Sequence, residues 1–140
     1  MSMTQQFTEV CQLLGEIVPT SSAGEQNTGY VSLANFNRWV CIIHAAAAAN
    51  DIDIDFEQGT TTAGAGEKTY NTNAKDVVVT ATTETTVVVE DTCSNFDVAG
   101  AFDCLNVEMT PVGARVCGLT LWGFIPRYAP VATTLIDEIA

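Results

Sequence analysis

The sequence predicts an all-β protein, an antiparallel β-sandwich of jelly-roll or Ig-like topology that could carry a short N-terminal helix or arm. Short runs rich in β-branched residues recur along the chain, and turn-forming residues separate them. After residue 18 no segment has the apolar spacing of a long helix. This pattern favours a sandwich, but it does not separate a jelly roll from an Ig-like topology.

The first apolar segment, residues 7–18, has two interpretations. The three-to-four spacing of an amphipathic helix is present in Phe7, Val10, Leu13, Leu14 and Ile17. Gly15, and the β-branched residues that precede Pro19, fit the start of a first strand equally well. From residue 19 to 29 the composition turns to Ser, Gly, Asn and Thr, which indicates a loop.

The strands are expected from residue 30 onward. In the clearest of them, residues 51–57, Ile52, Ile54 and Phe56 face one way and the aspartates face the other. The other strands are expected at 30–34, 38–44, 77–80, 86–89, 105–110 and 114–124. We therefore divide the chain into an N-terminal arm and loop (1–27), a β-sandwich domain (28–128) and a C-terminal tail (129–140).

The last expected strand, 114–124, is apolar on both faces. One face carries Arg115, Cys117, Leu119 and Leu121, and the other carries Val116, Gly118, Thr120 and Trp122. A strand of this kind lies at the centre of a sheet or has one face against a neighbouring subunit.

Composition restricts the function. The chain has 140 residues, the size of one domain, with 5 Lys+Arg against 17 Asp+Glu and a net charge of −12. Because phosphate neutralisation needs clustered basic residues, we expect neither nucleic acid nor membrane as a partner. No apolar stretch approaches the roughly 20 residues of a spanning helix, and the N-terminus has no secretory signal pattern. The cysteines at 11, 41, 93, 104 and 117 are expected to be free, mostly buried thiols of a protein made in a reducing cytoplasm.

Three acidic residues are the candidates for a metal site. Asp51, Asp53 and Asp55 alternate along their strand, but an EF-hand loop would need Gly and Glu where Phe56 and Thr62 stand. We interpret the three carboxylates as the solvated face of a strand, with a cation site as the alternative.

No segment has the pattern of a catalytic or cofactor site. Cys41 and His44 are three residues apart and would lie on opposite faces of one strand, so we interpret His44 as a core or interface residue. The segment from Gly64 to Lys68 differs from a phosphate-binding loop because Glu67 precedes the lysine. We therefore expect a protein that is not an enzyme and has no cofactor.

The order of segments resembles that of small virion proteins of tailed bacteriophages. The resemblance lies in residues 28–38 followed by an apolar strand, in residues 54–58 followed by a Gly-Ala-Gly loop and Lys68, and in residues 107–111 and 123–128. It covers residues 28–130, leaves out the N-terminal 27, and implies no catalytic residues to be carried over.

The resemblance implies a structural virion protein, in the first place a head decoration (cement) protein. Such a protein would bind the lattice of the major capsid protein, assemble with itself as a dimer or trimer, and lie on the capsid surface of the virion. A tail, connector or receptor-binding virion subunit is the first alternative, and a carbohydrate-binding β-sandwich module is the second. Both ends of the chain are the expected contacts with neighbours, and the interface candidates are Phe7, Leu13, Leu14, Arg127 and Tyr128.

Overall fold

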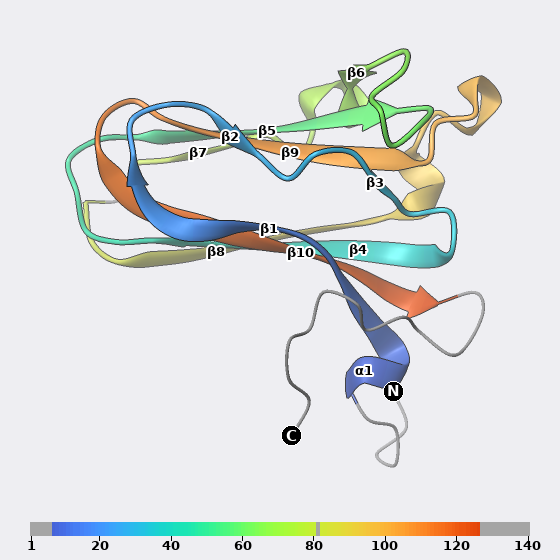
Figure 1. Ribbon diagram of the computed structural model, residues 1–140, viewed down its shortest axis with the longest axis horizontal. Helices are drawn as coiled ribbons and strands as arrows, with labels where there is room; N and C mark the ends of the chain where they lie inside the picture. The colour runs from blue at the N-terminus through green and yellow to red at the C-terminus, as the bar shows by residue number, and fades with distance from the viewer. Residues whose placement is uncertain (1–6, 81, 127–140) are drawn as a thin grey trace.

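Two antiparallel sheets packed face to face form the protein (Figure 1). The computed structural model describes residues 7–80 and 82–126. Helix α1 (Phe7–Val10) precedes ten strands: β1 (Cys11–Ser22), β2 (Gln26–Asn27), β3 (Val31–Ser32), β4 (Phe36–Ala45), β5 (Ile52–Gly59), β6 (Lys68–Thr69), β7 (Val77–Val79), β8 (Thr85–Thr92), β9 (Cys104–Pro111) and β10 (Arg115–Pro126). Short 3₁₀ turns lie between the later strands: η1 (Tyr70–Asn73), η2 (Cys93–Asn95) and η3 (Val98–Gly100).

The strand order is that of a jelly roll. Sheet A has the order β1-β10-β4-β8, and in sheet B β9 and β5 are the central strands. Strands β2 and β3 both pair with β9, and β6 and β7 both pair with β5, so each of these couples acts as one interrupted strand. If each couple is counted as one strand, the pairing is nested along the chain. Strand β1 pairs with β10, β2 and β3 pair with β9, β4 pairs with β8, and β5 pairs with β6 and β7. This nested pairing spread over two sheets distinguishes a jelly roll from an Ig-like sandwich and confirms the expected fold class.

The core lies between the sheets, and the predicted strand faces are confirmed. Ile52, Ile54 and Phe56 of β5 are buried, and the aspartates between them face outward. The last strand, β10, is central in sheet A, and its Arg115, Cys117, Leu119 and Leu121 are buried. The guanidinium of Arg115 donates to the carbonyl oxygens of Ala46 and Asn50, both at 2.8 Å, at the end of the sandwich. This buried charge therefore fastens the connection between β4 and β5.

An aromatic group joins the two sheets at the centre of the core. The ring of Trp39 lies 5.3 Å from that of Phe56 and 5.6 Å from that of Tyr70, which is 4.9 Å from Phe96. The Tyr70 hydroxyl donates to a carboxylate oxygen of Asp91 at 3.2 Å, so the polar tip of this group is not left unsatisfied. Trp39 is thus a core residue.

The structure decides between the two interpretations of the N-terminal segment, and it moves the expected start of the sandwich. The helix has only four residues, and in the described part of the chain no helix is long and apolar enough to cross a membrane. Residues 11–22 form β1, which pairs with β10, so the sandwich begins at Cys11 and not at residue 28. The loop expected from residue 19 begins only after Ser22. The expected tail, 129–140, lies outside the described residues.

Two register shifts explain the helix-like spacing of β1. Leu13 pairs with Trp122 and Gly15 with Leu121, so Leu14 is an extra residue, and a second shift occurs between Ile17 and Thr20. Leu13 faces outward with Trp122, whereas Leu14 and Ile17 pack against the core, so apolar residues of two different faces together imitate the spacing of a helix.

Candidate functional site

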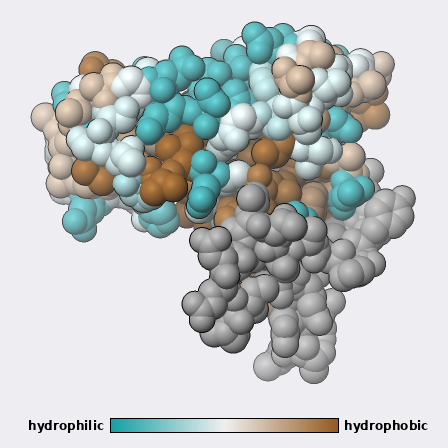
Figure 2. All heavy atoms as spheres, viewed as in Figure 1, coloured by the Kyte–Doolittle hydropathy of each residue, from teal (hydrophilic) through white to brown (hydrophobic). Residues whose placement is uncertain are grey.

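Apolar side chains gather on part of the outer surface of sheet A. Cross-strand pairing aligns Val88, Ile42 and Thr120 in one row and Val40 and Trp122 in the next. Val88 is 58% exposed, and the other three apolar side chains are half-buried. We call Val40, Ile42, Val88, Trp122 and Phe124 the apolar face. Figure 2 looks at the sandwich from the β1 side, where hydrophilic residues cover the upper layer, which is sheet B in Figure 1, and hydrophobic residues lie lower, at the level of β1.

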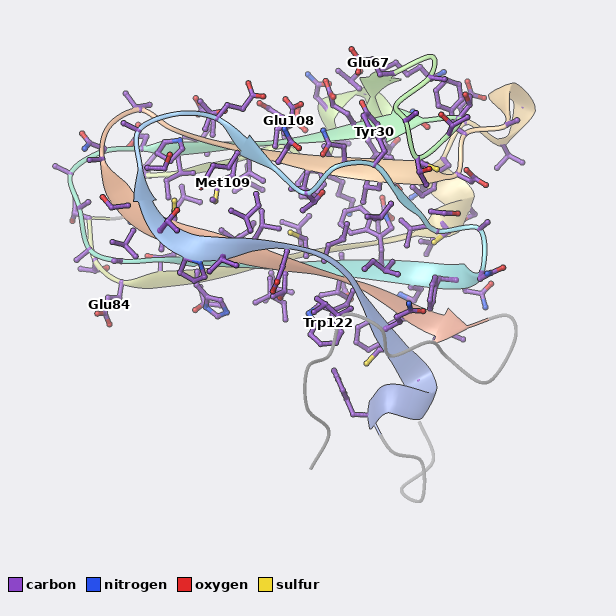
Figure 3. The ribbon with its side chains drawn as sticks, viewed as in Figure 1. Tyr30, Glu67, Glu84, Glu108, Met109 and Trp122 are labelled. Atoms are coloured by element: carbon purple, nitrogen blue, oxygen red, sulfur yellow. The ribbon has the colours of Figure 1, made fainter. Side chains whose placement is uncertain are left out.

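An aromatic cluster occupies the α1 end of the apolar face. The ring of Phe7 meets that of Trp122 edge to face at 5.3 Å and that of Phe124 at 6.4 Å. Cys11 and Leu13 are buried beneath α1 and do not belong to the core between the sheets. Trp122, which points away from the core in Figure 3, donates its indole N–H to the Thr120 hydroxyl at 2.9 Å. A small second hydrophobic cluster therefore lies outside the sandwich.

The structure separates the residues expected at an interface. Phe7, 53% exposed, and Leu13 both belong to the aromatic cluster. Leu14 packs against the core between the sheets, because the register shift turns it inward. Arg127 and Tyr128 lie outside the described residues.

The outer surface of sheet B is acidic. Asp53, Asp55 and Glu57 of β5 face outward beside Glu108 of β9, and Asp55 lies directly opposite Glu108. We call these four residues the acidic face. Figure 3 shows Glu108 above the upper sheet and its neighbour Met109 between the sheets. Desolvation, followed by the charges of Glu57, Glu25 and Asp55, raises the pKa of Glu108 to about 7.

Tyr30 fastens the Gly-rich loop to the edge of the acidic face. Its hydroxyl lies 2.9 Å from Glu57 Oε2 and 3.2 Å from Glu67 Oε2. Its ring fills the space where side chains at Gly59 and Gly64 would stand, since a Cβ at either position would come within 3 Å of the ring. Desolvation and the two carboxylates raise the pKa of the Tyr30 phenol. The loop is therefore packed and hydrogen-bonded against the sandwich.

The other candidates from the sequence have ordinary surroundings. Asp53 and Asp55 lie in β5 and Asp51 comes directly before it, and within the described residues no three potential metal ligands converge. His44 is exposed on the outer side of sheet A, 3.1 Å from the Thr86 hydroxyl, and so is not a core residue. Cys41 lies on the opposite face, as expected, and burial raises its pKa to about 12.

The remaining polar candidates are also in structural roles. Lys68 of the Gly-rich segment binds the carboxylate of Asp97 and lies 4.3 Å above the ring of Phe102. All five cysteines are buried and free, as expected.

Sequence reasoning missed the side chains that give each outer face its character. Val40 and Ile42 lie in the predicted strand 38–44, where they alternate with buried residues and therefore face outward. Glu108 alternates with buried neighbours in the same way, but its carboxylate partners come from β5 and depend on the strand pairing. Alternation gives the direction of a side chain, and only the register gives its neighbours.

Comparison with known proteins gives no match in sequence. No protein-family model matches the chain, and no curated protein sequence does. Among solved structures it is similar to a chain of the cowpea mosaic virus top component, the naturally occurring empty particles, with 5% identity, a TM-score of 0.48, and coverage of 94% of this chain and 96% of that one.

Two further plant virus structures are similar. A chain of broad bean stain virus has 10% identity and a TM-score of 0.47 over 100% of this chain and 97% of that one. Tobacco streak virus coat protein has 9% identity and a TM-score of 0.38 over 97% of this chain and 99% of that one. The assignment to the jelly roll rests on the strand order of this chain itself: it is a jelly roll with one apolar and one acidic outer face.

Proposed function

We propose that this protein is a structural virion subunit, a head decoration (cement) protein that binds the assembled capsid lattice through the apolar face. The observation that carries the proposal is the contrast between its two outer faces. Sheet A presents Val40, Ile42 and Val88 to solvent, whereas sheet B presents a row of carboxylates. A contiguous exposed apolar surface marks an interaction site, and an acidic surface suits contact with water.

The whole outer surface of sheet A, of which the apolar face is a part, has the dimensions of a protein interface. Strand β10 has 12 residues, so at ~3.4 Å per residue it is ~40 Å long. Sheet A has four strands about 4.8 Å apart, which gives a face on the order of 750 Å². A standard interface buries ≈ 800 Å² on each partner. One flat docking event on a shell would therefore use most of this face.

The sequence resemblance to tailed-phage virion proteins selects this function among those that a jelly roll can serve. The topology by itself is compatible with capsid and lectin domains. A lectin site needs aromatic rings exposed as a platform, whereas Phe7 and Trp122 pack edge to face against each other. The proposal therefore includes self-assembly, the major capsid protein as partner, and a position on the surface of the virion.

Lattice binding would stabilise a shell by mass action. A ligand that binds the assembled lattice and not its free subunits shifts the equilibrium toward the shell. Each contact can be modest, because many copies bind and a self-associated subunit can bind at several points at once.

The test is co-sedimentation of the purified protein with virus shells that lack it. Saturable binding at a stoichiometry set by the lattice, with a higher melting temperature of the shell, is expected. Ile42→Glu puts a charge on the apolar face and should abolish binding. Val78→Glu puts the same charge on β7 of sheet B and should leave binding intact. Absence of wild-type binding, or equal loss in both variants, contradicts the proposal.

A further inference from the structure

Strand β8 is a regular edge of sheet A, and among the described residues the strand that pairs with it is β4. The other edges of the sandwich are interrupted: β2, β3 and β6 have two residues each and β7 has three, and β1 has two register shifts. Strand β8 has eight residues and pairs with β4 without a shift, and it contains neither Pro nor Lys. Natural sheets protect their edges by short strands, bulges, Pro or Lys, because a regular free edge pairs with another strand.

The free backbone groups of β8 are those of its even-numbered residues. Lys75, which comes from outside sheet A, donates to the carbonyl oxygen of Glu90 at 2.7 Å. In an antiparallel ladder both backbone groups of a residue point to the same side, and alternate residues point the same way. The N–H and C=O of Thr86 and Val88 therefore also point away from β4.

We propose that β8 pairs antiparallel with β8 of a second copy across a two-fold axis at Val88. The two four-stranded sheets then form one continuous sheet, and both apolar faces lie on the same side of it. The inference rests on the proposed function and deepens it, since it names the contact through which the subunit self-associates.

Charge and side-chain direction select this register. With Val88 on the axis, Glu90 lies opposite Thr86 of the second copy, beside the exposed His44. A shift that places Glu90 opposite Val88 of the second copy brings the two Glu90 carboxylates diagonally close, which like charges disfavour. A shift by one residue would set outward side chains opposite inward ones. A carbonyl oxygen has two lone pairs, so Glu90 can keep its bond from Lys75.

A cysteine at the axis tests the register. Residues directly opposite in a hydrogen-bonded antiparallel pair have Cα atoms ≈ 5.5 Å apart, within the range of a disulfide. Val88→Cys should therefore give a cross-linked dimer on mild oxidation. The five native cysteines are buried and should not form cross-links of their own. The matched control is Val78→Cys, since Val78 and Val88 are both 58% exposed and lie in different sheets. Equal cross-linking in the two variants overturns the proposal.

Sedimentation velocity of the full chain tests the dimer without a cross-link. The wild-type protein should be dimeric, and Val88→Pro should be monomeric with a nearly unchanged melting temperature, because Pro removes an N–H that faces the second copy and not β4. A wild-type monomer at all accessible concentrations overturns the inference. A dimer that fails to bind shells overturns the proposed function alone, and a monomer that binds shells overturns the dimer alone.

Discussion

Asp55 and Glu108 lie directly opposite each other in the ladder between β5 and β9, so two carboxylates meet at the centre of the acidic face. Like charges in this position destabilise a sheet. The side-chain amide of Asn106 donates to Glu108 Oε1 at 3.2 Å and compensates part of this cost. Desolvation, with the charges of Asp76, Asp53 and Glu57, also raises the pKa of Asp55. The acidic face is therefore a place where folding depends on protonation.

The first prediction concerns the pH dependence of this pair. The pKa of Glu108 in the folded state is about 7, against 4.5 as its ordinary value, so between these values the folded state binds more protons than the unfolded state. The free energy of unfolding should therefore fall as pH rises from about 4.5 to about 7. Glu108→Gln removes this loss and should exceed the wild type in stability above neutral pH but not in acid.

Urea denaturation at a series of pH values measures this difference. Glu84→Gln, a change on the far turn between β7 and β8, is the control that alters net charge equally (Figure 3). A stability difference between Glu108→Gln and the wild type that does not depend on pH would refute the prediction.

The second prediction concerns the two faces of β5. Ile54 is fully buried opposite Met109, so Ile54→Asp places a carboxylate in the core and should leave the chain unfolded. Ile54→Val removes one methylene group and should cost about 0.5–1.5 kcal/mol. Asp53→Asn, on the outer face, should keep the fold. Near-ultraviolet circular dichroism and thermal melting distinguish these outcomes, and a cooperative melt of Ile54→Asp would contradict the assigned faces.

Much of the sandwich could be predicted because alternation is a local property. The sequence around Ile54 and around Leu119 shows which residues face inward, and both assignments are confirmed. The limit appears in β1, where the extra Leu14 produces a spacing that a helix also produces. Helix and bulged strand differ there only through pairing with β10, which the local sequence does not contain.

The candidate faces depend even more on pairing. The sequence gives the carboxylate of Asp55 and the carboxylate of Glu108 separately, and only the β5–β9 register makes them neighbours. The sequence places Trp122 on one face of the last strand, and only pairing with Leu13 places it in the outer cluster with Phe7. The indole ring of Trp122 is therefore half-buried outside the sandwich, against Phe7 of α1.

The third prediction concerns the N-terminus, where residues 11–22 form a strand of the sandwich and not part of an arm. The N-terminal end is an expected contact with neighbours, but deleting residues 1–18 also removes most of β1 and exposes the edge of β10. It should therefore prevent folding. Deleting residues 1–10 removes Phe7 and leaves β1 in place, so the sandwich should melt cooperatively while binding to shells weakens. Thermal melting and co-sedimentation of both deletions decide this, and a folded protein without residues 1–18 would contradict the role of β1.

The last prediction uses the two tryptophans as a matched pair. Trp39 is fully buried between the sheets, so Trp39→Ala should cost about 3–5 kcal/mol and unfold much of the population. Trp122 is half-buried on the apolar face, so Trp122→Ala should cost less stability. If the apolar face docks on a shell, Trp122→Ala should weaken binding by at least 2 kcal/mol, about 30-fold, as truncation of an interface tryptophan does. Thermal melting gives the first quantity and shell-binding isotherms give the second. Trp122→Phe, which keeps an aromatic ring against Phe7, should recover part of the affinity, and full affinity in Trp122→Ala would remove the apolar face from the proposed contact.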